Sequence, residues 1–406
     1  MATASGANIK LFDQAFAEFC NRRDLPDFDF IGLHGIWSWI SADNRAVIVD
    51  FVRRKLKLGG LLYISYNTLP GWADFAPIRE LMIQHFNAMS ARGQGIISRV
   101  EDAFTFINRL LSTEPSFVHA APNIGRRLEQ MKKQSVNYLT HEFFNRYWDP
   151  MYFAEMAKQL EAAKVQYVCS SDYLNLLDYV RLTEEHRAFL AEIPDPVFRE
   201  SVQSFMTNEQ FRQDYWLRGA GRMTAPEQAK ALRAERLILV FDPSDVFSLV
   251  IKTRFSEVTL SEEITRPLIG LMADHKPRSL GEIADALHPK GIALPELVRT
   301  LVTLIGSQIL APAQSAEESA AAAKACADLN SYLLNRSLGD GETDYLASPI
   351  TGGGVRVPRA QQIFLHAREL GLNTPAEWAR YSFEFMESWV NRLSRMASAW
   401  RIPKKG

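Results

Sequence analysis

The segment 28–72 constrains the fold more strongly than any other part of the sequence, because it has the pattern strand, helix, strand. The apolar run 28–33 has the length of a strand and ends at a polar turn. A helix is predicted over 44–57, where apolar residues recur three and four positions apart. The pair Gly59-Gly60 can end this helix, since glycine adopts the left-handed C-terminal geometry, and 61–67 is predicted to be a second strand.

Two strands joined by a helix form a parallel crossover unit, and ligands of such units usually bind beyond the carboxyl ends of the strands. In this sequence those ends are His34-Gly35 and Asn67-Thr68. His34 is a candidate general base, because an imidazole exchanges protons near neutral pH, but it could equally bond to the backbone and shape the turn. Asn67 offers a hydrogen-bond donor and an acceptor to a substrate. His34 and Asn67 are therefore the candidate catalytic residues.

The residues around both strand ends resemble a known family. The run Asp-Phe-Ile-Gly-Leu leads into His-Gly-Ile-Trp-Ser-Trp at 29–39, and Tyr-Ile-Ser-Tyr-Asn-Thr-Leu-Pro-Gly-Trp follows at 63–72. These stretches resemble the fourth and fifth strands of class I S-adenosylmethionine-dependent methyltransferases, especially the subgroup with a methyltransferase regulatory domain after the catalytic domain. The resemblance implies an α/β fold with a partial Rossmann-like sheet, followed by a mainly helical regulatory region. It also implies S-adenosylmethionine as cofactor and an acceptor that the sequence does not name.

The resemblance further implies roles for particular residues. Asp13 lies at the place of the acidic residue that follows the third strand, here expected over 8–12, and contacts the adenine of the cofactor. Four consecutive residues belong to the segment that lines the methionine arm of the cofactor and the acceptor: His34, Gly35, Ile36 and Trp37. Asn67 and Trp72 are the candidate substrate-binding residues, although large aromatic side chains near strand ends are often simply packed. Methyl transfer depends mainly on alignment, so the lack of an acid–base triad does not count against it.

The start of the sequence departs from the family pattern. Only seven residues precede Asn8, whereas a single crossover unit takes roughly 30. The glycine-rich loop of the family does not fit there, and Gly6 alone makes no fingerprint. Either Met1 is an internal methionine of a longer protein, which is the reading we favour, or the chain is a reduced relative. We expect impaired binding of S-adenosylmethionine.

Two classes of function therefore remain open. The first is a methyltransferase, seen here without its first strands, that acts on an unknown acceptor. The second is a non-catalytic regulatory or protein-interaction scaffold derived from a methyltransferase. An in-frame upstream sequence that encodes a strand and a Gly-x-Gly loop would favour the first, and a stop codon directly before Met1 would favour the second.

The missing strands also have a consequence for the sheet. In the family the first strand lies beside the fourth, so its absence leaves the strand 28–33 without a neighbour on one side. An unpaired apolar edge invites pairing with another chain or collapse onto the segment 9–12. We expect the edge to be open, closed by 9–12 or covered by a partner molecule, and it is a candidate homodimer surface.

Three regions are expected along the chain. They are a partial methyltransferase domain with a helical cap at 1–178, a regulatory domain at 179–312 and a helical region at 313–406. Within the first, helices are predicted at 75–89, 97–111 and 121–133, and they form either a cap over the strand ends or a plain helical packing unit. A further helix is predicted at 151–163 and a sixth sheet strand at 165–169. Beyond it, 195–219 is predicted to be mostly helical, and strands are predicted at 236–241 and 247–252.

Three short helices are predicted within 261–310, in the order of a winged-helix unit, at 262–273, 279–287 and 295–307. The third helix would read DNA, but its only cation is Arg299 on a largely apolar surface. Base and phosphate contacts need several cationic or amide side chains, so a packing helix is the favoured interpretation. The net charge of −1 gives no broad field for nucleic acid or an anionic membrane. We expect neither as a partner.

The remaining sequence features exclude several classes of protein. Three distant cysteines, Cys20, Cys169 and Cys326, offer neither a disulfide framework nor a metal-binding spacing. His141-Glu142 begins a zinc-protease pattern, but Asn145 replaces its second histidine, so no metal site is expected. No N-terminal signal-peptide core is evident, and no run approaches the ~20 apolar residues of a membrane span. The sequence predicts a soluble, cytoplasmic protein.

Overall fold

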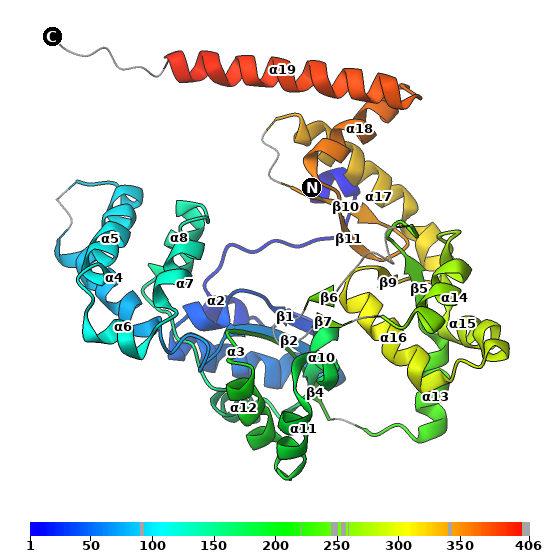
Figure 1. Ribbon diagram of the computed structural model, residues 1–406, viewed down its shortest axis with the longest axis horizontal. Coiled ribbons are helices and arrows are strands. Elements are labelled where there is room, and N and C mark those ends of the chain that lie inside the picture. The colour runs from blue at the N-terminus through cyan, green and yellow to red at the C-terminus, as the bar shows by residue number, and fades with distance from the viewer. Residues whose placement is uncertain are drawn as a thin grey trace. The chain divides into compact units, whose positions relative to one another are not determined.

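The computed structural model describes residues 1–89, 93–219, 221–244, 251–252, 257–258, 260–339 and 343–399 (Figure 1). The chain divides into two compact units. The sheet unit comprises Phe12–Thr224 and Val250–Leu260, and the C-terminal unit comprises Met1–Leu11, Ala225–Leu249 and Ser261–Gly406. The functional domain boundaries expected at 178 and 312 stay predictions.

A four-stranded mixed sheet forms the centre of the sheet unit, with the strand order β1-β2-β4-β3. Strands β1 (Phe28–Leu33) and β2 (Leu56–Asn67) are parallel, and α3 (Ala42–Lys55) connects them. Strand β4 (Phe211–Arg218) runs antiparallel between β2 and β3 (Val165–Ser170). The crossover unit and the α/β fold class predicted from the sequence are thereby confirmed.

One face of the sheet is buried beneath α3 and α9 (Phe153–Glu161). Successive side chains of a strand point to opposite faces, so every second residue of β2 enters this core. Leu62, Ile64 and Tyr66 are wholly buried there and pack with Trp216 of β4. Burying an aliphatic side chain of this size contributes roughly 1.5–3 kcal/mol. The core therefore fixes the register of the strands and, with it, the positions of their carboxyl ends.

Strand β4 corrects the prediction of a mostly helical stretch at 195–219. The helix α12 (Pro196–Met206) agrees with that prediction, but Phe211–Arg218 is a strand. Arg212, Asp214 and Trp216 are buried and the residues between them are half-buried, so the alternation of a strand is present. Two of the three inward positions hold charged residues. The alternation of apolar and polar residues that is typical of a strand is therefore absent from the sequence of β4.

The strand predicted over 8–12 is wrong, because these residues have an irregular backbone. Ile9 and Leu11 are 57% and 86% exposed. A lone extended segment is not a strand unless its N–H and C=O groups find partners. Among the described residues β1 pairs only with β2, and Phe30 is 54% exposed. Within that part of the chain the outer edge of β1 is open, which is the first of the three expected arrangements.

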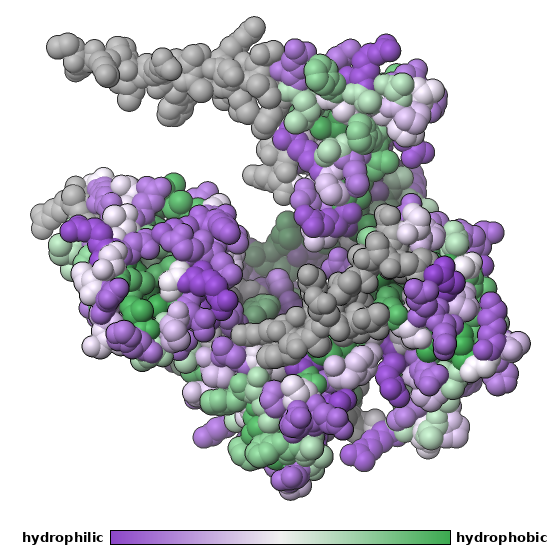
Figure 2. All heavy atoms as spheres, in the orientation of Figure 1, coloured by the Kyte–Doolittle hydropathy of each residue, from purple (hydrophilic) through white to green (hydrophobic). Residues whose placement is uncertain are grey.

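A bundle of helices follows β2 and has a core of its own, which includes Phe75, Ile107, Ile124 and Phe143. Figure 2 shows a mostly hydrophilic outer face over this bundle, with hydrophobic residues gathered between the helices. The helices predicted at 75–89, 97–111 and 121–133 are confirmed, although the third is shorter than expected, and their role as a cap stays a prediction. The helices are α4 (Ala76–Ala88), α5 (Ile96–Leu111), α6 (Ser116–Ala120), α7 (Ile124–Met131) and α8 (Val136–Phe143).

Short elements complete the sheet unit. They are α2 (Phe16–Cys20), η1 (Trp37–Trp39), η2 (Tyr173–Leu176), α10 (Asp178–Arg181), α11 (Glu184–Ala191), β6 (Ile251–Lys252) and β7 (Glu257–Val258). Of the strand expected at 247–252, residues 251–252 form β6, and 247–250 lie outside the described residues.

The C-terminal unit begins with a small sheet of order β8-β5-β9 and the three helices expected within 261–310. Helix α16 buries Leu297, Leu301 and Leu304, and its cation Arg299 is exposed. The winged-helix resemblance stays a prediction. The elements are β5 (Arg236–Leu239), α14 (Glu262–Met272), β8 (Arg278–Ser279), α15 (Leu280–Leu287), η4 (His288–Lys290), α16 (Leu294–Gly306) and β9 (Leu310–Pro312), preceded by α13 (Ala225–Ala234).

The rest of this unit is a hairpin packed with long helices. Its elements are α17 (Ala316–Ser337), β10 (Tyr345–Ser348), β11 (Gly353–Arg356), α18 (Arg359–Glu369), α19 (Pro375–Ala399) and the N-terminal turn α1 (Ala2–Ser5). In the described part of the chain, every helix is too short or too polar to cross a bilayer.

Candidate functional site

The carboxyl ends of β1 and β2 lie side by side, because the two strands are parallel neighbours. His34 follows β1, and its Nδ1 is 2.9 Å from the hydroxyl of Tyr63. The two rings stack with their centroids 5.9 Å apart. The Ser65 hydroxyl lies 3.4 Å from the same nitrogen and accepts a 2.9 Å hydrogen bond from the Gly35 N–H. The first predicted site segment is thus tied to β2 through side chains of that strand.

The contact with Tyr63 affects which of the two imidazole nitrogens of His34 is available to a ligand. Burial raises the pKa of Tyr63, so its hydroxyl keeps its proton at neutral pH. When this hydroxyl donates to Nδ1, the neutral imidazole carries its own proton on Nε2. The His34 side chain is exposed. An imidazole oriented through one nitrogen can exchange a proton or a hydrogen bond at the other.

Gly35 gives the turn an open side. Its φ is +65°, in the left-handed region that glycine adopts without strain. A Cβ built on this residue would meet no atom within 4 Å outside its two chain neighbours. The residue is therefore required by the backbone conformation rather than by crowding, and the space beside it is free for a ligand.

Ile36 and Trp37 contribute through their backbone and their packing. Trp37 is wholly buried in the sheet core, and Ile36 packs against the same core. The Trp37 carbonyl accepts a 3.1 Å hydrogen bond from Nε of Arg45, whose guanidinium also pairs with Asp149 at 2.6 Å. The indole Nε1 of Trp37 is buried and has no partner among the described residues. These contacts hold the segment after His34 firmly against the core.

Asn67, at the end of β2, is only 2% exposed and is held from two sides. Its backbone N–H donates to Ser38 Oγ at 2.8 Å, and its Nδ2 donates to Oε1 of Glu142 at 3.3 Å. Trp39 Nε1 donates to the Glu142 carbonyl at 2.9 Å, which fixes the end of α8 at this site. The structure thus brings Asn67 against a carboxyl group rather than leaving its amide free.

Glu142 is the functional candidate that the sequence analysis missed. Burial raises its pKa, and the hydrogen bond from Asn67 acts against that rise. A half-buried carboxyl of raised pKa can take up a proton closer to neutral pH than a free glutamate does. In the sequence, His141-Glu142 forms only the start of an incomplete zinc motif, and no spacing connects Glu142 with a residue 75 positions earlier. Its approach to Asn67 depends on the fold of the helical bundle.

Trp72 and Asp13 lie apart from these contacts. Trp72 belongs to an aromatic cluster with Phe75, Phe143 and Trp148, at centroid distances of 5.5, 5.6 and 5.7 Å, and its Nε1 donates to the Gln210 carbonyl at 2.8 Å. Asp13 is exposed in the irregular segment before α2, and it is not among the hydrogen-bond partners of His34 in the described part of the chain, which are Tyr63 and Ser65. In the described part of the chain, no cluster of three or more His, Cys, Asp or Glu residues is arranged to hold a metal ion.

The sequence is similar to one described protein family and to proteins from two bacteria. Residues 135–218 match a family described as a predicted methyltransferase regulatory domain. The uncharacterized protein sll1526 of Synechocystis sp. is 38% identical over 369 residues, which covers 90% of this chain and 71% of that protein. The uncharacterized protein RP789 of Rickettsia prowazekii is 28% identical over 221 residues, covering 50% of this chain and 37% of that protein.

Two solved structures of PKMT2 from Rickettsia typhi have a similar fold. One superimposes with a TM-score of 0.64 at 18% identity and covers 95% of this chain and 78% of that one. The other, in complex with AdoHcy, gives a TM-score of 0.63 at 18% identity and covers 90% and 73%. At this level of identity the similarity shows a shared fold.

Proposed function

Because this chain is a methyltransferase-like protein that belongs to the family of the Synechocystis protein sll1526, we propose that it acts in methyl transfer from S-adenosylmethionine to an acceptor. The observation that carries the proposal is the meeting of the carboxyl ends of β1 and β2. There His34 and Gly35 contact β2, and Asn67 contacts Glu142. Ligands of parallel crossover units bind beyond these ends. The AdoHcy complex of PKMT2 from Rickettsia typhi lends further support.

The residues after β1 fit part of such a cofactor. When bound, S-adenosylmethionine supplies a methyl group on a positively charged sulfur. Residues other than the two chain neighbours leave the space beside the Gly35 Cα open to 4 Å, and the neighbouring His34 has an exposed polar ring. In the proposed site these two residues line the methionine arm, while Ile36 and Trp37 hold the backbone from the core side. Asp13, proposed to contact the adenine, has no part in the contacts of this site.

Asn67 and Glu142 form the acceptor side of the proposed site. A lone pair of an acceptor nitrogen or oxygen would form its bond to the methyl carbon as the bond from that carbon to sulfur breaks, and the electron pair of the broken bond would stay on sulfur. The methylated acceptor would then release a proton. The Glu142 carboxylate takes this proton, and the hydrogen bond from Asn67 Nδ2 holds the carboxylate in position. Trp72 shapes the turn after β2, because its indole is anchored to the segment that leads into β4.

The affinity of this chain for the cofactor is proposed to be weak. The 406 residues contain no Gly-x-Gly-x-x-Gly run, the fingerprint with which dinucleotide-binding crossover units hold a cofactor through backbone N–H groups. We expect a dissociation constant on the order of 1 mM for S-adenosylmethionine, measured by calorimetric titration. Micromolar binding would contradict the proposed impairment.

The test of the site is ligand-observed NMR with AdoHcy. Saturation transfer from the protein to AdoHcy should be strong with the unaltered chain and largely lost with Gly35→Val, because a β-branched residue strains the left-handed turn and fills the open space. Gly371→Val is the matched control, since Gly371 has a φ of +87° and equally open surroundings in the C-terminal unit. Equal signals from both variants would refute the proposed position of the cofactor.

A non-catalytic interaction scaffold is the second candidate function. The observation that favours it is the outer edge of β1, which is open within the described residues and carries the exposed Phe30. Unpaired strand edges are sites of pairing with other chains. Pairing of two copies through β1 is the form of this function that we propose to test.

A further inference from the structure

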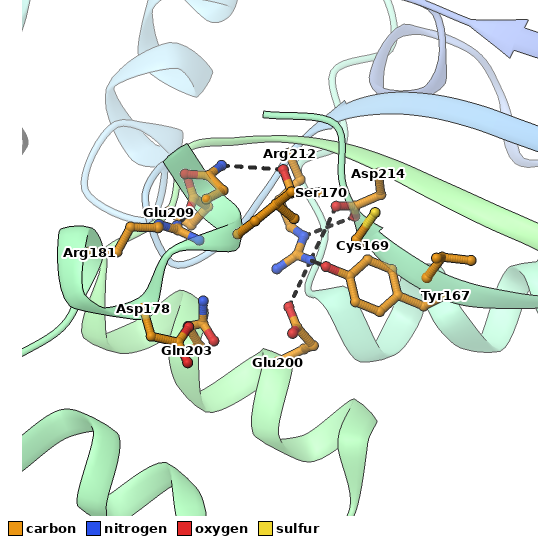
Figure 3. A pocket seen from close by; sticks show the side chains of 13 residues that line it. Tyr167, Cys169, Ser170, Asp178, Arg181, Glu200, Gln203, Glu209, Arg212 and Asp214 are labelled. Atoms are coloured by element: carbon orange, nitrogen blue, oxygen red, sulfur yellow. Dashed lines mark hydrogen bonds and ion pairs between the residues drawn. The ribbon is translucent and has the colours of Figure 1, made fainter. Parts of the chain in front are cut away.

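A cavity of about 180 Å³ opens at the carboxyl end of β3, between η2, α10, α12 and the start of β4 (Figure 3). All of its lining residues lie within 135–218, the part of the chain that matches the regulatory domain. None of them is among the residues of the strand-end site described above. A cavity of ~150 Å³ holds a molecule of the size of benzene, so this cavity has room for a small organic molecule.

The two guanidinium groups in the cavity wall are already engaged. Arg212, only 7% exposed, donates from Nε to Asp214 at 2.9 Å and pairs with Glu200 at 2.9 Å. Arg181 pairs with Glu209 on the neighbouring side of the cavity. The cavity therefore offers no free cation to an anionic ligand.

The cavity wall holds more carboxylates than cations. Four carboxylates line it, and the two guanidinium groups face them: Asp178, Glu200, Glu209 and Asp214 against Arg181 and Arg212. The Asp178 carboxylate and the Gln203 amide make no hydrogen bond or ion pair within the described residues. In Figure 3 both side chains, with that of Glu200, extend from α10 and α12 toward the cavity. Asp178 is exposed, whereas Glu200 and Gln203 are half-buried. Carboxylates that lack a counter-charge attract a hydrogen-bond donor of positive charge.

We propose that this cavity is a binding site for a small organic cation, with a primary ammonium group that donates to Glu200, Asp178 and the Gln203 side-chain oxygen. An ammonium group has three donors and no acceptor, which matches three acceptors that lack a full complement of partners. An anion would meet excess negative charge, and an apolar molecule would leave the carboxylates desolvated without compensation. This site is independent of the proposed methyl transfer.

The probe for the test is 1-aminobutane, which is a cation at neutral pH, and the matched anion is butyrate. Calorimetric titration at constant ionic strength should give binding of 1-aminobutane in the millimolar range or tighter, and none of butyrate. Asp178→Asn should weaken binding several-fold and Glu200→Gln about tenfold or more, because each removes a charge-assisted hydrogen bond. Glu192→Gln is the control, since this exposed carboxylate follows α11 outside the cavity and its loss should leave the affinity unchanged.

Folding of each variant is checked by circular dichroism, because Glu200 also pairs with Arg212. Asp178→Asn breaks no contact in the described structure. If Glu200→Gln fails to fold, the calorimetric titration of Asp178→Asn with 1-aminobutane is sufficient to test the proposal. The proposal is overturned by any of three results. These are no heat from 1-aminobutane at concentrations on the order of 10 mM, binding of butyrate as strong as that of the amine, or unchanged affinity in Asp178→Asn.

Discussion

Replacing Arg212 by methionine should lower the free energy of unfolding of the sheet unit by about 3–5 kcal/mol at neutral pH, the usual result of removing one member of a buried ion pair. Arg212 is 7% exposed and Asp214 1% exposed, so the carboxylate would lose its counter-charge without gaining access to water. One hydrogen bond would remain, from the Tyr66 hydroxyl at 2.8 Å. Methionine fills most of the volume of the arginine side chain. The loss of unfolding free energy therefore comes from the missing charge rather than from poorer packing.

The same substitution should make stability depend on pH. Burial raises the pKa of Asp214, while Arg212 and Tyr66 act against the rise, so the rise is larger when Arg212 is removed. A carboxyl whose pKa is higher in the folded than in the unfolded chain stabilises the fold fully only below its unfolded pKa of about 3.9. That stability is lost as the pH rises through the folded pKa, by up to about 1.4 kcal/mol per pH unit. The deficit of the variant should therefore be smallest near pH 4 and grow toward neutral pH.

Urea unfolding followed by tryptophan fluorescence measures this effect, with Trp216 as a reporter in the core of the same sheet. The control is Arg53→Met, because Arg53 is 51% exposed in its pair with Asp50 and should contribute less than about 1 kcal/mol. A loss below about 1 kcal/mol for the Arg212 variant, or an equal loss at about pH 4 and at neutral pH, would refute the reasoning.

Three further predictions concern the turn after β2, the sheet edge and nucleic acid. Gly71→Ala places a Cβ 2.2 Å from the Glu209 carbonyl oxygen and should cost about 1–3 kcal/mol in urea unfolding, whereas Gly125→Ala, in open space, should not destabilise. The open edge of β1 should give a concentration-dependent dimer in light scattering that Phe30→Lys abolishes; a monomer at every concentration would contradict this. A labelled DNA duplex should show no salt-dependent shift with the chain, since α16 exposes the single cation Arg299, and such a shift would refute the packing interpretation.

The crossover unit could be predicted because its signals are local. Apolar residues of α3 recur at helical spacing, and β1 and β2 are apolar runs bounded by turn residues. The helix ends at Lys55, two residues earlier than expected, and the pair Gly59-Gly60 lies inside β2 rather than at a helix terminus. Glycines tolerate both roles, so the sequence alone does not distinguish them.

Strand β4 could not be predicted because its inward positions hold a buried ion pair instead of apolar side chains. Arg212 and Asp214 are stable there only through partners on other elements, such as Tyr66 and Glu200. The prediction of a strand at 8–12 failed for the complementary reason, since Ile9 has the right local pattern but no strand beside it within the described residues. Contacts with residues distant in the sequence therefore determine both that β4 forms and that 8–12 does not form a strand.

The site was predictable to the level of strand ends and no further. The parallel pattern placed His34 and Asn67 at the ends of neighbouring strands, and the structure places them there. Their contacts with Tyr63 and Glu142 depend on the strand register and on the path of the helical bundle, which no local pattern encodes. The roles proposed for all these residues stay predictions.

The central claim is that the cofactor lies against the turn after β1, and hydrogen–deuterium exchange with AdoHcy present at millimolar concentration tests it most directly. The amides of 34–37 and of 65–67 should exchange more slowly, because a ligand beside Gly35 shields the turn and stabilises its bond to Ser65. The cavity beside β3 should be unaffected. Protection confined to that cavity, or no protection at either strand end, would contradict the account.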